Sequence, residues 1–378
     1  MIAVQGQFYF KCSAGSKKDF IDTENLKFFE VVESCGVILP YFKLVFLTSD
    51  DNIVSKLHEG QPLNIQFGKS PDSFDDMVLS CNKVHAMPDG ANRQEVTVSG
   101  FLGKNNFLSQ PKINITGKIS GVEAVKATVS KSFNYPSTNV QKSQDLMNWV
   151  QYNTTDRNFV FDTVMHAYTK GSVLATAICA NGDFRLRDIK VDLAKKANKV
   201  DWKISNSSKD DKDIRHGTYQ VQSTHGYMNS LGTSGYEINT FTPETGVEAT
   251  HVQKAEVITA LSKSVSKSAE VESRYFGTQM QNQNVHENFW KAYQQNLVGL
   301  LSLSTVKINL PLDEAYRAIR PLDVVMFKDV SLIDKTTSNE MYSGIYLVSK
   351  VTRGIFKMKC TVSIEICREA FNGVRNAN

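Results

Sequence analysis

Few residues in this sequence have the type and spacing that chemistry requires. His286-Glu287 begins like the metal-binding helix of a zinc protease, in which a second histidine follows the first by four residues. That position is Trp290 instead. The remaining histidines, which show no spacing typical of metal ligands, are His58, His85, His166, His216, His225 and His251. We therefore predict no metal site.

Two groups of carboxylates are candidates for calcium binding or acid–base chemistry. Asp210, Asp211 and Asp213 lack the glycine and the closing glutamate of an EF-hand loop. Lysines alternate with them, which favours a solvated loop. Asp75 and Asp76 are adjacent, and adjacent residues on a strand point to opposite faces of a sheet. A hydrolase is therefore a poor fit, and we predict no catalytic residues and no cofactor.

The cysteines also indicate no chemistry. No two form a CxxC pair, and sparse cysteines in a chain of this length are typical of buried thiols in a reducing compartment. They are Cys12, Cys35, Cys81, Cys179, Cys360 and Cys367. Walker A, GxGxxG and GxSxG motifs are absent from the sequence.

The three tryptophans are candidates for ligand stacking or for core packing. Trp149 and Trp290 lie among apolar residues at helical spacing, which favours the core. Trp202 lies in a charged stretch and is a candidate for an interface.

Composition is that of an ordinary globular protein. The 378 residues are 41% hydrophobic and 22% charged, with a formal net charge of +4. Residues 1–105 hold 10 Lys/Arg and 13 Asp/Glu, a net −3, so the remainder carries +7. Neither part has the dense basic surface of a dedicated nucleic-acid binder. We expect no signal peptide and no membrane insertion, since the longest apolar stretch, 297–306, is far shorter than the ~20 residues that span a bilayer.

Alternating apolar and polar residues predict a β-domain at the start of the chain. Its expected strands cover residues 7–12, 26–34, 41–48, 63–67, 77–84 and 95–102, with one or two helical turns at 53–58. The middle of the chain favours helices at 121–132, 143–152 and 158–170. The Asn181-Gly182 turn then predicts a hairpin of strands 174–179 and 183–189.

The rest of the chain mixes loops, one long helix and further strands. We predict a solvated loop at 194–213, a strand at 219–227, a surface helix or mobile arm at 256–273, and a long helix at 285–303. Strands are expected at 305–310, 323–327, 344–352 and 357–366. Phe289, Trp290 and Leu297 of the long helix should pack near Trp149.

This order predicts an α+β, mainly β fold. The late strands need partners, and the isolated strands after residue 194 are the natural ones, which implies a discontinuous second barrel. We expect a first β-barrel at 1–108, a helix-containing domain at 109–193 plus 240–304, a second β-barrel at 194–239 plus 305–371, and a C-terminal tail at 372–378.

Four stretches resemble the central hub proteins of bacteriophage baseplates, a family that includes the hub region of the type VI secretion spike. They are ILPYFKLVFLTSDD with EGQPLNIQFG within 31–67, the segment 146–189, HENFWKAYQQNLVGLLSLSTVKINLP at 286–311, and IRPLDVVMF, SGIYLVSKVTRGIF and CTVSIEICRE within 319–369. Together they cover more than half of the chain. One departure is that the family's usual glycine near Leu322 is missing.

The resemblance implies an architecture and a set of partners. Each chain would carry two tube-like β-barrels beside a helical domain, and three chains would form a homotrimer. Its six barrels would match the sixfold tail tube above a threefold spike. Implied partners are tail-tube or tube-initiator proteins, a separate central spike protein and baseplate wedge proteins, since we expect no spike domain after Asn378. The protein would be assembled in the host cytoplasm, reside in the virion baseplate, provide a DNA channel and read no nucleic-acid sequence.

Two alternatives remain open from the sequence. The chain could be a distal tail adaptor or another tube-like tail protein, which sequence separates poorly from a hub. A phage-encoded hydrolase using Asp75 and Asp76 is the weaker alternative, for the geometric reason given above.

Overall fold

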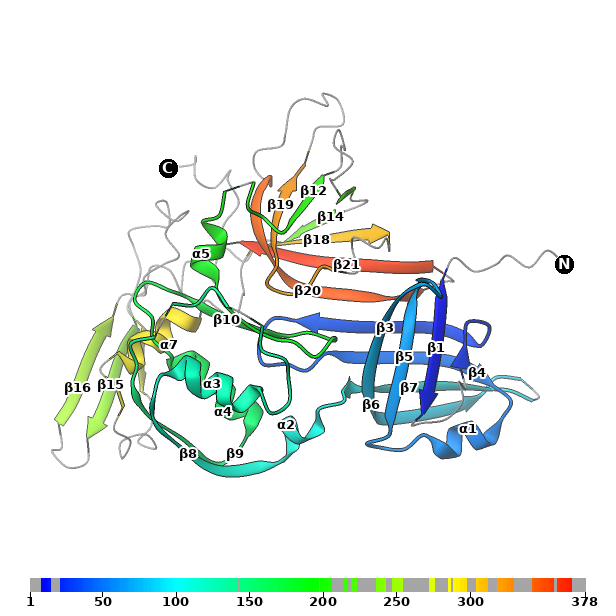
Figure 1. Ribbon diagram of the computed structural model, residues 1–378, viewed down its shortest axis with the longest axis horizontal. Helices are drawn as coiled ribbons and strands as arrows, with labels where there is room; N and C mark the ends of the chain where they lie inside the picture. The colour runs from blue at the N-terminus through cyan, green and yellow to red at the C-terminus, as the bar shows by residue number, and fades with distance from the viewer. Residues whose placement is uncertain are drawn as a thin grey trace.

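The computed structural model describes residues 8–14, 21–90, 92–136, 138–141, 143–196, 198–205, 214–215, 219–222, 236–242, 247–253, 272–275, 285–286, 288–297, 304–311, 318–329, 342–356 and 359–368. These residues form a mainly β fold, as the sequence predicts. Their strands pair into one large sheet and three small ones (Figure 1). No helix in these ranges is long and apolar enough to cross a membrane.

The first half of the large sheet is built from the N-terminal strands, all paired antiparallel in the order β3-β4-β7-β6-β5-β1-β2. These are β1 (Tyr9–Ala14), β2 (Ile21–Asp22), β3 (Leu26–Ser34), β4 (Tyr41–Thr48), β5 (Pro62–Ser70), β6 (Ser73–Pro88) and β7 (Gln94–Leu102), with helix α1 (Asp51–Lys56) after β4. Alternation along β4 places Leu44 and Phe46 in the core.

This half-sheet curls around its core (Figure 1). Phe29 of β3 contacts Phe10 of β1 and Phe67 of β5, with ring centroids 5.2 and 5.0 Å apart. Among the described residues, β1 and β3 are joined by these side chains and not by a hydrogen-bonded ladder. The sheet is therefore open, and no closed barrel forms in the described part of the chain.

The second half of the large sheet combines strands from residues 202–222 with strands from residues 304–368. These are β12 (Trp202–Ser205), β13 (Ile214–Arg215), β14 (Tyr219–Gln222), β18 (Ser304–Pro311), β19 (Val324–Lys328), β20 (Gly344–Phe356) and β21 (Lys359–Arg368). Strand β14 pairs with β18, and β12 runs parallel to β19. Strand β21 alternates as predicted, with Val362, Ile364 and Ile366 buried in the second core.

Strand β20 joins the two halves of the sheet. Its first residues pair with β19, and its later ones, from Lys350 to Phe356, pair with β3. A register shift against β21 at Val348/Lys350 lies where β20 changes partner. The two halves consequently form one continuous sheet, where the sequence predicted two separate barrels.

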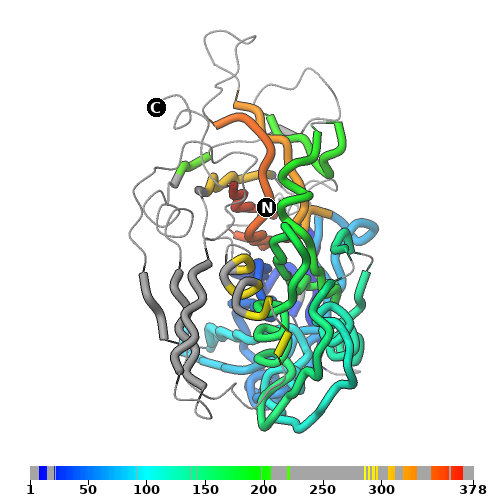
Figure 2. Tube along the Cα trace, turned by 90° about the vertical axis from the view of Figure 1, so that its left-hand side faces the viewer, coloured from blue at the N-terminus to red at the C-terminus, as the bar shows by residue number. Residues whose placement is uncertain are grey.

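The helical part lies beside this sheet (Figure 1). It contains α2 (Asn105–Ser109), β8 (Pro111–Ile119), α3 (Gly121–Val129), β9 (Met147–Thr155), α4 (Asp156–His166), β10 (Leu174–Ile178), β11 (Phe184–Asp188), α5 (Ile189–Leu193) and α7 (Phe289–Leu297). Ser120 and Glu123 form a capping box that begins α3. In the turned view, the orange and red strands β19–β21 lie above this green and cyan part (Figure 2).

A third, small sheet is formed by the segment between β14 and α7. Strand β15 (Tyr236–Thr242) pairs antiparallel with β16 (Val247–Gln253) and parallel with β17 (Glu272–Tyr275).

Several predicted elements were wrong or only partly right. The helix predicted at 143–152 is strand β9, because Met147, Trp149 and Gln151 alternate as buried residues against β8, a strand that the sequence analysis missed. The loop predicted at 194–213 contains β12. The long helix predicted at 285–303 is described as α7, Phe289–Leu297. The helix or arm at 256–273 lies almost wholly outside the described residues.

Candidate functional site

The residues singled out for chemistry do not converge on one site. Among the described residues, no group of three or more His, Cys, Asp or Glu side chains could hold a metal ion. Asp75 and Asp76 lie side by side on β6, and Asp76 is exposed while Asp75 is half-buried, as opposite faces require. Asp210, Asp211 and Asp213 lie outside the described residues.

The aromatic candidates are packing residues where the structure describes them. Trp149 is buried with Phe159 and Phe289 in one cluster, which confirms the predicted contact with the segment around Trp149 for Phe289. His286 lies beside this cluster, with its ring centroid 5.7 Å from that of Phe289, and its Nε2–H donates to the backbone carbonyl of His166 at 2.9 Å. The side chains of Trp290 and Leu297 lie outside the described part of the chain.

None of the six cysteines forms a disulfide. Cys12, Cys81, Cys179 and Cys367 are buried, as predicted, while Cys35 and Cys360 are half-buried. Burial raises the pKa of the Cys367 thiol to about 12, so this thiol carries no thiolate at neutral pH.

The main polar cluster lies instead where the two halves of the sheet meet the β10–β11 hairpin. Glu33 of β3 and Arg353 of β20 form an ion pair, and their side chains are 0% and 1% exposed. Arg353 also donates to the carbonyl of Ile319, and the Glu33 carboxylate accepts from the backbone N–H of Ala180 at 2.7 Å. This pair therefore ties together β3, β20, the turn before β19 and the hairpin.

The charge of Arg353 persists in the core. Burial lowers the pKa of its guanidinium below the ordinary value, and the adjacent Glu33 carboxylate opposes that shift. A guanidinium stays protonated at neutral pH. Buried pairs of this kind contribute little net stability, but the loss of one partner leaves an uncompensated buried charge.

A tight turn, Arg320 to Asp323, continues the cluster. Pro321 is followed by Leu322 with φ of 70°, and the Asp323 N–H donates to the Arg320 carbonyl at 3.1 Å. This is the pattern of a type II turn, in which the third residue is left-handed and usually glycine. Leu322 occupies that position because its side chain is fully buried in a cluster with Val324 and Leu347.

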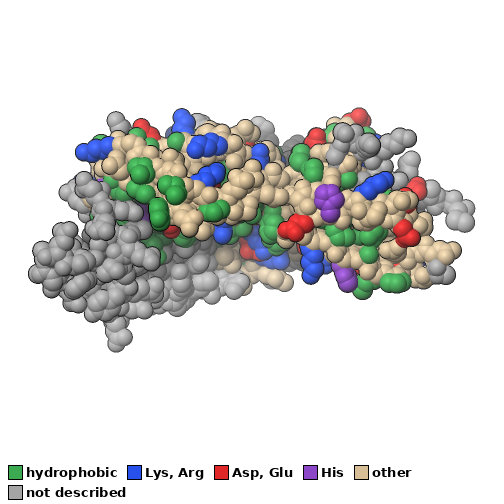
Figure 3. All heavy atoms as spheres, turned by 90° about the horizontal axis from the view of Figure 1, so that it is seen from below, with side chains coloured by type: hydrophobic (Ala, Val, Ile, Leu, Met, Phe, Trp, Pro, Cys, Tyr) green, Lys and Arg blue, Asp and Glu red, His purple; other side chains and the backbone are tan. Residues whose placement is uncertain are grey.

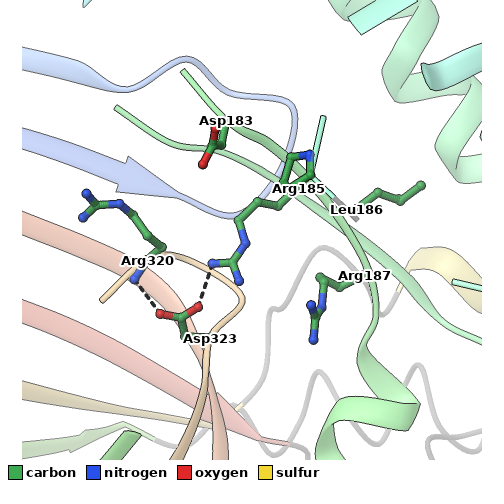
Figure 4. A pocket seen from close by; sticks show the side chains of 7 residues that line it. Asp183, Arg185, Leu186, Arg187, Arg320 and Asp323 are labelled. Carbon is green, nitrogen blue, oxygen red and sulfur yellow. Dashed lines mark hydrogen bonds and ion pairs between the residues drawn. The ribbon is translucent and has the colours of Figure 1, made fainter. Parts of the chain in front are cut away.

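The Asp323 carboxylate is the meeting point of this turn (Figure 4). It accepts from the Arg320 N–H at 2.8 Å and from the Trp202 indole N–H at 2.9 Å. It also pairs with Arg185 of β11 at 2.8 Å, and Arg185 donates to the Pro321 carbonyl at 2.6 Å. Trp202, a candidate interface residue in the sequence, thus has an internal role.

A pocket of about 230 Å³ opens at this point. Its lining residues are Pro136, Asp183, Arg185, Leu186, Arg187, Arg320 and Asp323 (Figure 4). Arg187 turns to Asp192, with which it makes two hydrogen bonds of 2.9 and 3.0 Å. With Arg185 and Arg187 both bound to carboxylates, the arrangement holds elements together. We call the residues Glu33, Arg185, Arg320, Asp323 and Arg353 the junction.

Comparison with known proteins gives a likeness in structure alone. No protein-family model matches the sequence, and no curated protein sequence does. Among solved structures, a tail protein from Neisseria meningitidis MC58 matches with a TM-score of 0.58 and 9% identity over 97% of both chains. The 43 kDa tail protein of prophage MuSo2 from Shewanella oneidensis matches with a TM-score of 0.57 and 9% identity over 95% of this chain and 96% of that chain.

The fold is that of phage tail proteins. A structural likeness is also found to an E. coli component of the type VI secretion system, which is itself described as structurally similar to bacteriophage T4 tail proteins. That protein matches with a TM-score of 0.53 and 8% identity over 95% of this chain and 77% of its own. The resemblance drawn from the four sequence stretches is thereby confirmed at the level of fold.

In this tail-protein fold, the junction was the part that sequence reasoning missed. Glu33 lies in a strand whose bounds were predicted correctly, whereas Arg353 lies just past the predicted strand 344–352, in the later part of β20. Each takes an inward position among apolar residues. Two opposite charges at inward positions of two strands were the available signal. Their pairing depends on the β3–β20 ladder, which joins residues 320 positions apart.

Proposed function

We propose that this chain is the subunit of a baseplate hub, a homotrimeric structural ring that connects a sixfold tail tube to a threefold central spike. The observation that carries the proposal is the likeness, over at least 95% of this chain, to two phage tail proteins and to a type VI secretion component. The role is architectural and not enzymatic. Its place is the virion baseplate, after assembly in the host cytoplasm.

Two β-units per chain are central to this proposal. Residues 1–108 would form one tube-like unit and residues 194–239 plus 305–371 the other, with residues 109–193 plus 240–304 as the helix-containing domain. The continuous sheet through β20 and β3 supports a rigid link between the two units. Three chains would then present six units to a sixfold tube and surround a channel for DNA.

The partners follow from this position. Tail-tube or tube-initiator proteins would bind one face of the ring, a separate spike protein the other, and baseplate wedge proteins the periphery. No sequence-specific nucleic-acid contact and no membrane insertion are proposed.

The mass of the purified protein tests the proposal. Light scattering at micromolar concentration, with and without the spike protein, should give about 127 kDa, three times the 42.3 kDa chain. A strict monomer in both conditions would contradict the hub. A stable hexamer would favour the distal tail adaptor.

A further inference from the structure

Strand β8 forms one open edge of the two-stranded β8–β9 ribbon. Among the described residues, β8 pairs with β9 alone, and none of its nine residues is buried. Outside that ladder, only one backbone group of β8 has a hydrogen-bond partner in the described part of the chain. It is the Ile119 carbonyl, which accepts from the Trp149 indole N–H at 3.2 Å. The edge of β8 that points away from β9 is therefore open along most of its length.

The hydrogen bonds at Trp149 show which residues of β8 face this open edge. The Trp149 N–H donates to Thr116 Oγ1 at 2.8 Å, and the same hydroxyl donates to the Trp149 carbonyl at 3.2 Å, so both backbone groups of Trp149 face β8. Backbone direction alternates along a strand, so Gln151 also faces β8, where it lies opposite Asn114. Asn114 thus faces β9, and the residue on each side of it faces the open edge.

These two residues, Ile113 and Ile115, also present their side chains to solvent. They are 71% and 65% exposed, and together with Tyr152, which is 74% exposed, they form an apolar stripe on the outer face of the ribbon. Seen from below, hydrophobic side chains lie over the β8–β9 ribbon, with Lys and Arg side chains around them (Figure 3). A contiguous apolar stripe indicates a binding surface. Beside an open edge it is suited to β-augmentation, in which backbone bonds supply affinity and alternate side chains supply specificity.

The inner face of the ribbon is already packed. Met147 and Trp149 point inward and form a cluster with Ala124 of α3 and Phe159 of α4. An added strand at the open edge would therefore displace neither the β8–β9 ladder nor a core contact.

The ends of β8 are protected against indiscriminate pairing, but its centre is not. Pro111 begins the strand, Lys112 and Lys118 carry charge near its ends, and a bulge follows Ile115. Proline, lysine and bulges are the features with which proteins protect sheet edges. The segment 113–115 has none of them, so the open part of the edge is short and well defined.

Charge indicates the kind of strand that fits this edge. Strands β8 and β9 contain two lysines and no acidic residue. Lys112 pairs with Asp156, whereas the exposed Lys118 has no acidic partner among the described residues. An acidic residue on the added strand would complement Lys118. Pairing of β8 with β8 of a second copy would instead bring two basic edges together, which is unfavourable.

We propose that the open edge of β8 at residues 113–115 binds an extended strand of another protein. The added strand exchanges backbone hydrogen bonds with Ile113 and Ile115 and becomes the third strand of the ribbon. It carries apolar side chains at two alternate positions over the stripe and an acidic side chain beside Lys118. This inference goes beyond the proposed hub function and does not depend on the number of chains in the ring.

A synthetic strand tests the edge. The probe is a fluorescently labelled peptide of alternating valine and threonine with a glutamate at each end, and its polarisation should rise saturably as protein is added. Ile115→Pro removes an N–H at the open edge. It should weaken binding by about tenfold, because one carbonyl of the peptide loses its hydrogen bond. No binding to the wild type, or equal binding to Ile115→Pro, would overturn the augmentation site.

A charge reversal tests the acidic character of the partner strand. Lys118→Glu should weaken binding of the glutamate peptide and strengthen binding of a peptide with lysine at each end. Lys131→Glu, which changes an exposed lysine outside the ribbon, is the matched control and should bind both peptides as the wild type does. Equal behaviour of the two variants would overturn the acidic partner.

Proline at two neighbouring positions checks the direction of the edge. Asn114→Pro removes a bond of the β8–β9 ladder and should lower the unfolding temperature. Ile115→Pro should lower it less, because proline is tolerated where the N–H of an edge strand faces solvent. Equal losses would overturn the assigned edge.

The particle mass distinguishes another protein from a second copy. Light scattering without peptide should give the same mass for the wild type and for Ile115→Pro. A mass that falls in Ile115→Pro would show that a second copy of the chain occupies the edge, and would overturn the proposed partner strand.

Discussion

The guanidinium of Arg353 is buried and forms an ion pair with Glu33, and the Asp75 carboxylate adds a weaker electrostatic interaction. Glu33→Gln removes the countercharge but keeps the shape of the side chain. We expect a loss of about 3–5 kcal/mol in the free energy of unfolding, since an unpaired buried charge remains. Urea unfolding at neutral pH measures this loss.

An exposed ion pair provides the control for that experiment. Lys27 and Glu95 are 2.7 Å apart, and both side chains are partly exposed. Exposed pairs contribute little because water screens them. Glu95→Gln should therefore leave the unfolding curve almost unchanged, and a Glu33→Gln variant that behaves the same way would contradict the role given to the junction.

The second residue-scale prediction concerns the imidazole of His166. Its ring is stacked on Phe289 at 3.7 Å between centroids, and its side chain is buried. Burial lowers its pKa to about 3, and the nearby His286 adds to that shift. The unfolded chain binds the proton first, at its ordinary pKa of about 6.5.

The contribution of neutral His166 to the free energy of unfolding should therefore be fully present above pH ~6.5. It should be lost progressively as the pH is lowered toward 3. At pH 5 the expected contribution of His166 to this loss is about 2 kcal/mol. His166→Phe should remove that part of the pH dependence, and His58→Gln, which changes an exposed histidine, should retain it. Equal pH profiles for wild type and His166→Phe, from urea unfolding at pH 7 and 5, would show that this site does not titrate.

At the scale of elements, the β3–β20 ladder depends on a residue without a side chain. A Cβ on Gly354 would overlap the backbone carbonyl of Phe29 and crowd Glu30. Gly354→Ala should force the two strands apart and cost about 1–3 kcal/mol, as overpacking does. Thermal unfolding measures this cost.

Gly117 of β8 is the matched control. A Cβ there would meet no atom within 4 Å, so Gly117→Ala should not lower the unfolding temperature. If Gly354→Ala unfolded at the same temperature as Gly117→Ala, the close approach of β3 and β20 would be disproved.

Strands were predicted from the sequence more successfully than the elements around them. Alternation gave β3 and β4 with their observed bounds because one face of each is buried. Residues 146–150 fit helical spacing as well as alternation, and only pairing with β8 decides between the two. The turn at Leu322 could not be predicted from the sequence either, since its left-handed backbone follows from burial of the side chain and not from residue type.

At the scale of the whole molecule, the sequence predicted the tail-protein fold but not how its halves connect. Two β-blocks were expected as separate barrels, whereas β20 pairs with both β19 and β3. A ladder between residues so far apart in the chain produces no pattern among neighbouring residues from which it could be predicted. The junction could not be predicted for the same reason, because its charged residues meet only after the sheet has formed.

The symmetry of the assembled ring is the most direct test of the hub function. Averaged electron-microscope images of the purified particle, viewed along its channel, should show threefold symmetry with six similar lobes, because each of three chains supplies two β-units. Particles of one chain, or a ring whose six lobes come from six chains, would contradict the proposed hub.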